Sequence, residues 1–156
     1  MATDYRFDTE HQLVVTCYWN HVSAADVAAA RRARERDPRL TAATAHLVDA
    51  TGIVHLELSA PETRDIAGYV ATGSDETSRL RTAMLATTDV VFGMCRMFGL
   101  RAEALYEGEQ IRVFRTWEDA ARWLQRDLAH ARSLADAMKA LPGLPVGGLE
   151  GTGGPA

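Results

Sequence analysis

"FGMCRMFGLRAEALYEGEQIRVFRTWEDAARWLQ", residues 92–125, carries the strongest pattern in the chain. Its first half repeats apolar residues at three- and four-residue steps, which is the spacing of one face of an α-helix. Asp89, just upstream, is expected to cap this helix, and Gly108 is expected to end it. No catalytic motif occurs in the stretch, so the pattern indicates packing rather than chemistry.

The second half of the stretch predicts a strand and a further helix. Residues 111–114, IRVF, alternate as a half-buried strand does. Thr116 and Asp119 then have the spacing of a capping box and open a helix at the next residue. Its apolar stripe continues beyond the quoted residues, so we expect one long helix over 117–141, stopped by Pro142.

Upstream, short apolar runs alternate with helical segments. Ser23 and Ser59 each stand three residues before an acid and are expected to cap helices. The expected strands cover residues 5–7, 13–19, 45–49 and 82–87, with loops at 50–59 and 72–78. This order predicts an α/β fold with a mixed, mainly parallel β-sheet of four or five strands, packed against about four α-helices.

Bulk composition limits the class of protein. The 156 residues suffice for one domain, expected over 1–141, and the Gly/Pro-rich residues 142–156 are expected to be disordered. A net charge of −4 with mixed signs argues against nucleic-acid binding. No apolar run is long enough for a membrane span, and Cys17 and Cys95 form no paired motif. We therefore expect a cytoplasmic protein with no membrane or nucleic-acid partner.

One basic cluster interrupts this mixture. It consists of Arg31, Arg32, Arg34 and Arg36, broken by Glu35 and Asp37. Such a cluster on a predicted helix is typical of a face turned to water.

The segments "TAMLATTDVVFGMCRMFGLRAEAL" and "IRVFRTWEDAARWL" together resemble the SpoIIAA-like branch of the STAS domains (sulfate transporter and anti-sigma-factor antagonist). The residues that carry the resemblance are Gly93, Arg96, Phe98, Val113, Phe114, Arg115, Ala120, Trp123 and Leu124. It covers about residues 4–124 and implies a small mixed sheet with helices against it. It also implies that Gly93 lets its helix approach the sheet closely, and that Trp123 and Leu124 lock the final helix.

The resemblance implies a function through protein partners. The best-studied members carry a serine at the start of the second helix that a kinase partner phosphorylates. Alignment places Asp49 on the acid that ends the preceding strand and Leu58 on the serine position. Ser59 lies one place late, so we interpret it chiefly as a helix cap.

Candidate ligand-binding residues are few. Thr87, Thr88 and Asp89 follow a strand and open a helix, where free N–H groups can receive an anion, although Asp89 would repel it. Asp49 and Ser59 complete the candidate set. His55 and Glu57 could join Asp49 at a metal, but loop side chains facing water explain them better. We expect no catalytic residues, no metal and no cofactor.

The sequence favours a non-catalytic protein that binds a protein partner or itself. The alternative is a module for a small apolar or anionic ligand, and an enzyme of unknown reaction ranks third. A homodimer is expected through the 117–141 helix, whose continuing stripe needs a cover: Leu128, Ala131, Leu134, Ala135 and Met138. The competing possibility is that this helix breaks and folds back on its own domain.

Overall fold

The computed structural model describes residues 2–72, 81–105 and 111–140, and these residues form one sheet and two layers of helix. The predictions made for Gly108, for most of the 72–78 loop and for the 142–156 tail lie outside this range. The elements are β1 (Thr3–Asp8), β2 (Leu13–Ser23), α1 (Ala24–Glu35), β3 (Ala45–Glu57), α2 (Ala60–Thr72), β4 (Thr82–Leu85), α3 (Asp89–Leu105), β5 (Ile111–Phe114), α4 (Trp117–Leu124) and α5 (Ala129–Ala140).

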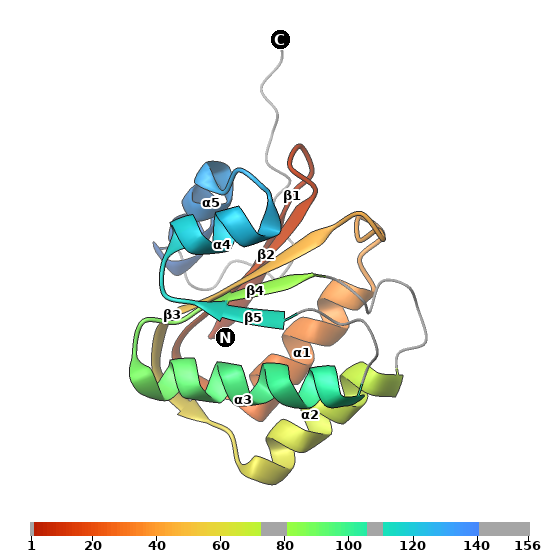
Figure 1. The fold of residues 1–156 in the computed structure, drawn as a ribbon, viewed down its shortest axis with the longest axis vertical. Helices are drawn as coiled ribbons and strands as arrows, with labels where there is room; N and C mark the ends of the chain where they lie inside the picture. Colours follow the sequence, from red (N-terminus) through yellow and green to blue (C-terminus); the bar gives the residue numbers. More distant parts are fainter. Residues whose placement is uncertain (1, 73–80, 106–110, 141–156) are drawn as a thin grey trace.

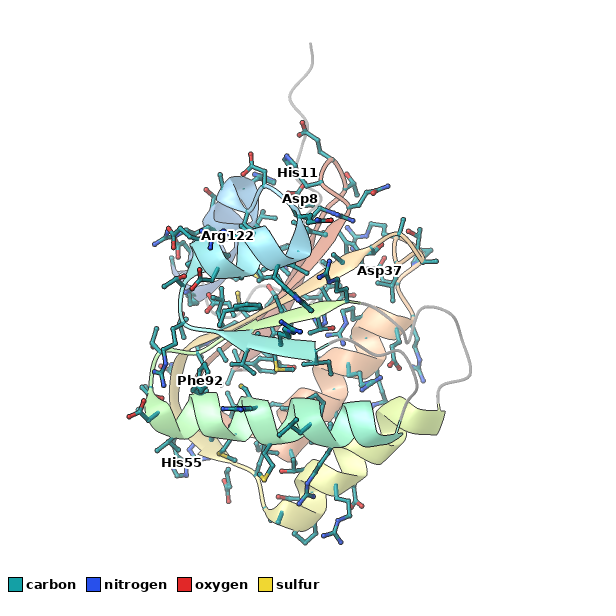
Figure 2. All side chains as sticks on the ribbon, in the orientation of Figure 1. Asp8, His11, Asp37, His55, Phe92 and Arg122 are labelled. Atoms are coloured by element: carbon teal, nitrogen blue, oxygen red, sulfur yellow. The ribbon has the colours of Figure 1, made fainter. Side chains whose placement is uncertain are left out.

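The five strands lie in the order β1-β2-β3-β4-β5, with β1 antiparallel to β2 and every other pair parallel. The predicted α/β fold is confirmed. The opening hairpin turns through Gln12 in the left-handed region, at φ 53°, while Asp8 accepts a hydrogen bond from the backbone N–H of His11 at 3.2 Å (Figure 2). The parallel strands follow one another through helices, as right-handed crossovers require.

The helices cover the two faces of the sheet separately (Figure 1). Helices α1, α2 and α3 lie on one face, and α4 and α5 lie on the other. Successive side chains of a strand point to opposite faces, so β2 and β3 supply both cores. The core beneath α4 and α5 includes Leu13, Val15, Cys17, Leu47 and Leu85, and the core beneath α1–α3 includes Tyr18, Val22, Val48, Met84 and Ile111.

β3 is longer than the sequence indicated. Residues 50–57, expected as a loop, continue the strand because β2 also continues and pairs with them as far as Ser23↔Glu57. Register shifts beside Trp19 bend this part of the ladder. Gly52 sits at the bend, where an added Cβ would lie 3.1 Å from the Trp19 Cβ and 3.2 Å from the Tyr18 carbonyl oxygen.

The expected continuous helix over 117–141 is wrong. It breaks after Leu124, where Gln125 takes a left-handed conformation at φ 56°, and α5 starts anew with Asp127 accepting from the Ala129 N–H at 2.9 Å. The break folds α5 onto the sheet and buries most of the stripe on its own domain: Leu128, Ala131, Ala135 and Met138, with Leu134 half-buried. The reason for expecting a dimer through this helix is therefore lost.

One of the expected packing roles changes. Gly93 has nothing within 4 Å of an added Cβ, so it does not bring α3 close to the sheet; Gly99 does, with Ile111 Cγ2 at 3.2 Å. Leu124 is buried as expected. Trp123 is half-buried, with its ring 5.6 Å from that of Phe114 between centroids.

Asp49 joins α5 to the middle of the sheet. Its carboxylate is fully buried and accepts hydrogen bonds from Lys139 Nζ at 2.8 Å and from the N–H and hydroxyl of Thr51 at 3.0 and 2.6 Å. Burial lowers the pKa of Lys139, but the hydrogen bond and charge of Asp49 outweigh it and leave that pKa above its ordinary value. The candidate site residue Asp49 is thus a structural anchor for α5.

We expect Asp49→Ala to lower the free energy of unfolding by about 2–4 kcal/mol, because it removes a buried charged acceptor and leaves Lys139 without its closest partner. Asp136→Ala is the matched control: this exposed carboxylate lies 3.7 Å from the same ammonium, and its loss should cost at most about 0.5 kcal/mol. Urea unfolding measures both. Equal losses in the two variants would show that Asp49 does not anchor the helix.

Candidate ligand cavity

The residues proposed as a strand-end ligand site make local hydrogen bonds at the start of α3. Thr88, not Asp89, caps α3, since its hydroxyl accepts from the Val91 N–H at 3.4 Å. Asp89 is the first residue of the helix and is paired with Arg115 at 2.8 Å. Arg115 also donates to the Thr87 carbonyl oxygen at 2.9 Å. These contacts connect the residue after β5 to the start of α3.

Ser59 is placed as a helix cap. Its hydroxyl accepts from the Glu62 N–H at 3.2 Å, and the Glu62 carboxylate accepts from the Ser59 N–H at 2.8 Å. Hydrogen bonds from Ser59 lower the pKa of Glu62. The reciprocal pair is a capping box, as at Ser23 and Asp26.

The candidate residues are not brought to one place. Asp49 faces α5, Ser59 starts α2, and Thr87–Asp89 lie between β4 and α3. Exposed His21 contacts Glu57 at 2.9 Å and the ring of His55 at 4.8 Å between centroids. Within the described ranges, no group of three His, Cys, Asp or Glu side chains is arranged to hold a metal ion.

A cavity of about 140 Å³ lies between the sheet and helices α1–α3. Most of its wall is apolar, with Val22, Val48, Ile53, Met84, Phe98 and Ile111 among the lining residues. Protein interiors are close-packed, and voids larger than a water molecule are few. A cavity of this size on one face of a small sheet is therefore the candidate site.

The cavity has one polar end. Arg31 and Arg34 come from the last turns of α1, and His46 and Thr82 come from the paired first residues of β3 and β4. The polar end therefore lies at the amino ends of the parallel strands, opposite to the edge where the sequence analysis placed a ligand. Ile53 lines the cavity towards the other end of β3.

Arg34, Thr16 and His46 form a hydrogen-bonded chain at this end. Arg34 Nη1 donates to Thr16 Oγ1 at 3.1 Å, and the same oxygen lies 2.9 Å from His46 Nε2. Thr16 and His46 are both buried. Burial, followed by the positive charges of Arg34 and Arg31, holds the pKa of His46 well below its ordinary value, so the ring is neutral at pH 7.

The polar end keeps one positive charge without an ion-pair partner in the described part of the chain. Arg31 is paired with Glu35 at 2.6 Å, whereas the guanidinium of Arg34 has no carboxylate within ion-pair distance there. Burial lowers the pKa of Arg34, but an arginine stays charged at neutral pH.

Sequence reasoning missed these residues for an identifiable reason. The cluster around Arg34 was interpreted as a water-facing surface, which holds for exposed Arg32 and Arg36 but not for Arg34. A signal was present: Val27, Ala30 and Arg34 lie at three- and four-residue steps, so Arg34 continues the apolar stripe of its helix.

The fold has a counterpart among solved structures. An uncharacterised protein of the DUF3478 family from Shewanella loihica PV-4, with a SpoIIAA-like fold, superposes with a TM-score of 0.50 at 16% sequence identity, over 79% of this chain and 92% of that chain. This chain has a SpoIIAA-like fold. The fold that the sequence resemblance implied is therefore confirmed.

The likeness to that SpoIIAA-like structure concerns the fold alone, because so low an identity does not carry function. No family model matches the sequence, and no curated protein does. None of the described helices combines the length and apolar character needed to cross a bilayer.

We expect the free energy of unfolding to fall as the pH is lowered from 6.5 to 5, because His46 stays neutral in the folded chain but gains a proton on unfolding. This stability is fully present above the unfolded pKa and is lost at about 1.4 kcal/mol per pH unit below it, until the folded pKa is reached. Urea unfolding across this range measures the slope.

His46→Gln should flatten that slope, and His130→Gln, a change at an exposed histidine, should preserve it. His11, whose pKa is raised by its hydrogen bond to Asp8, acts with the opposite sign and is unchanged in both variants. An unaltered slope in His46→Gln would contradict a neutral His46 in the folded protein.

Proposed function

We propose that this protein binds a small, largely apolar molecule in the cavity between the sheet and helices α1–α3. The observation that carries the proposal is the cavity itself, of about 140 Å³. An engineered apolar cavity of about 150 Å³ in another protein binds benzene. The size therefore suits one ring or a short aliphatic chain.

The lining of the cavity supports binding. Small-molecule sites are mostly apolar, with a few polar groups that fix the ligand's orientation. This cavity has that composition: aliphatic and aromatic walls, and polar groups gathered around Arg34 and His46. Side chains come from strands and from three helices, so the walls are held by the core of the fold.

The chemistry of the lining favours binding without catalysis. Burial raises the pKa of the Cys95 thiol to about 12, which leaves it protonated and a poor nucleophile. His46 is neutral, and its Nε2 is engaged by Thr16. Neither group in the cavity is poised for nucleophilic attack or for acid catalysis at neutral pH.

The proposed setting is the cytoplasm. Both cysteines are free thiols, and the net charge of −4 disfavours contact with nucleic acid.

Methionine methyl groups provide a direct test. Met84 and Met94 line the cavity, whereas Met138 packs in the core on the opposite face of the sheet. With ¹³C-methyl methionine in the full chain, toluene should shift the signals of Met84 and Met94 and leave Met138 unchanged. Ala50→Leu, which adds carbon atoms to the cavity wall, should abolish these shifts. Equal shifts at all three methionines, or none, would contradict the proposal.

A second candidate function is pairing with another copy of the chain, and one surface of α3 favours it. Val90, Met97 and Leu100 are 72%, 37% and 60% exposed, and they share a helix face with exposed Gly93. Gly93 has no atom within 4 Å of an added Cβ, so a second helix can approach closely there. An exposed apolar helix face of this kind is typical of an interface, and a two-fold axis would pair it with itself.

Light scattering of the full chain at tens of micromolar tests this pairing. We expect a dimer, and we expect Leu100→Glu to give a monomer because it places a charge in the apolar contact. Arg122→Glu is the control, since this exposed residue lies on α4, on the opposite side of the sheet from α3 (Figure 2). A monomeric parent chain would contradict the pairing.

A further inference from the structure

Among the described residues that line the cavity, Arg34 is a cation with no carboxylate within ion-pair distance. Its guanidinium has five N–H donors. In the described part of the chain, its single side-chain hydrogen bond is the one to the neutral hydroxyl of Thr16. Buried charges in proteins are normally paired, because an isolated one is costly to remove from water. The ion-pair partner that this side chain lacks among the described residues can be supplied from the cavity that it lines.

We propose that the ligand is a monocarboxylic acid with an apolar body, held with its carboxylate on Arg34 and its body against the aliphatic and aromatic wall. This inference rests on the proposed function and adds the chemical class of the ligand. A guanidinium presents parallel N–H groups that match the two oxygens of a carboxylate.

The charge balance favours one negative charge on the ligand. Arg31 and Glu35 compensate one another at 2.6 Å, and His46 is neutral. That leaves the single positive charge of Arg34, which one carboxylate neutralises. A phosphate dianion would bring a second negative charge into a largely apolar space. Among the described residues that line this space, the other arginine, Arg31, is already paired with Glu35.

The volume limits the body of the acid. About 140 Å³ holds a body on the order of a benzene ring, by comparison with cavities of similar size. The apolar wall formed by Val48, Ile53 and Phe98 gives such a ring no hydrogen-bonding partner. The class is therefore a small aromatic or short-chain aliphatic monocarboxylate.

The chain Arg34–Thr16–His46 fixes where the carboxylate binds. Thr16 is fully buried in β2, and its hydroxyl holds one Nη1 hydrogen of Arg34. This contact positions the guanidinium at the amino-end edge of β3, close to His46. Thr16 and His46 are positioning residues, and Arg34 is the residue that contacts the ligand.

Phenylacetate and 2-phenylethanol form a matched pair of probes with the same ring and chain, differing in the carboxylate. Titration of each into the full chain is followed through the methionine methyl signals of Met84 and Met94, with Met138 as the internal reference. We expect phenylacetate to bind at least about tenfold more tightly than the alcohol, as a charged hydrogen-bonded pair provides.

Substitutions on α1 assign the preference to one side chain. Arg34→Met should weaken phenylacetate binding by about tenfold or more and leave binding of the alcohol within about twofold. Arg32→Met, a change at an exposed arginine of the same helix, should alter neither. Binding of the alcohol also reports that the cavity of the Arg34→Met variant is intact.

The outcomes separate the class of ligand from the binding function. If 2-phenylethanol binds as tightly as phenylacetate, the cavity is a ligand site but the carboxylate assignment is overturned. The same assignment falls if benzyl phosphate binds more tightly than phenylacetate. If no probe shifts Met84 or Met94, both the assignment and the proposed binding function fall. Should Arg34→Met fail to fold, the comparison of probes on the unaltered chain still decides.

Discussion

The register between β2 and β3 determines what each face of this domain can do. Thr16 pairs with Val48, and Cys17 pairs with Asp49, so neighbouring residues of each strand point to opposite faces. Thr16 is thereby placed beside the cavity, while Asp49 is directed to α5. A slip of one residue would exchange every such side chain between the faces.

The two faces differ in how they are filled. Beneath α4 and α5 the sheet carries a packed apolar core, and the buried carboxylate of Asp49 is paired there with Lys139. Beneath α1–α3 the core leaves a cavity, and half-buried Arg34 has no carboxylate of the described residues within ion-pair distance there. The ion pair of Asp49 and the proposed ligand cavity therefore lie on opposite faces of the sheet.

The sequence was informative where structure depends on local chemistry. The alternation of strands and helices and the capping pairs at Ser23, Ser59 and Thr116 could be predicted, because each involves residues within one turn. Features set by distant contacts could not. The left-handed residue that separates α4 from α5 is a glutamine, Gln125, and the apolar stripe resumes after it at the same spacing. Periodicity alone therefore could not reveal the break.

The candidate site escaped prediction for a related reason. A general preference directed attention to the carboxyl ends of parallel strands, whereas the polar end of this cavity lies at their amino ends. The spacing of Arg34 after Val27 and Ala30 did indicate its orientation, but the neighbouring charged residues led to the interpretation of the whole cluster as water-facing. In the same way, the motif pointed to Gly93, but the rotation of α3 makes Gly99 the glycine that meets the sheet.

The ion pair of Asp49 with Lys139 spans 90 positions of sequence, and this has a consequence for the newly made chain. α5 is synthesised after every strand of the sheet, so until residues 129–140 emerge, the surface of β2 that carries Cys17 and Trp19 has no cover. A nascent domain in this state exposes an apolar sheet surface, and Asp49 lacks its partner Lys139. Exposed surfaces of this kind promote aggregation and are bound by chaperones. Closure of this face therefore depends on residues that are synthesised after the whole sheet.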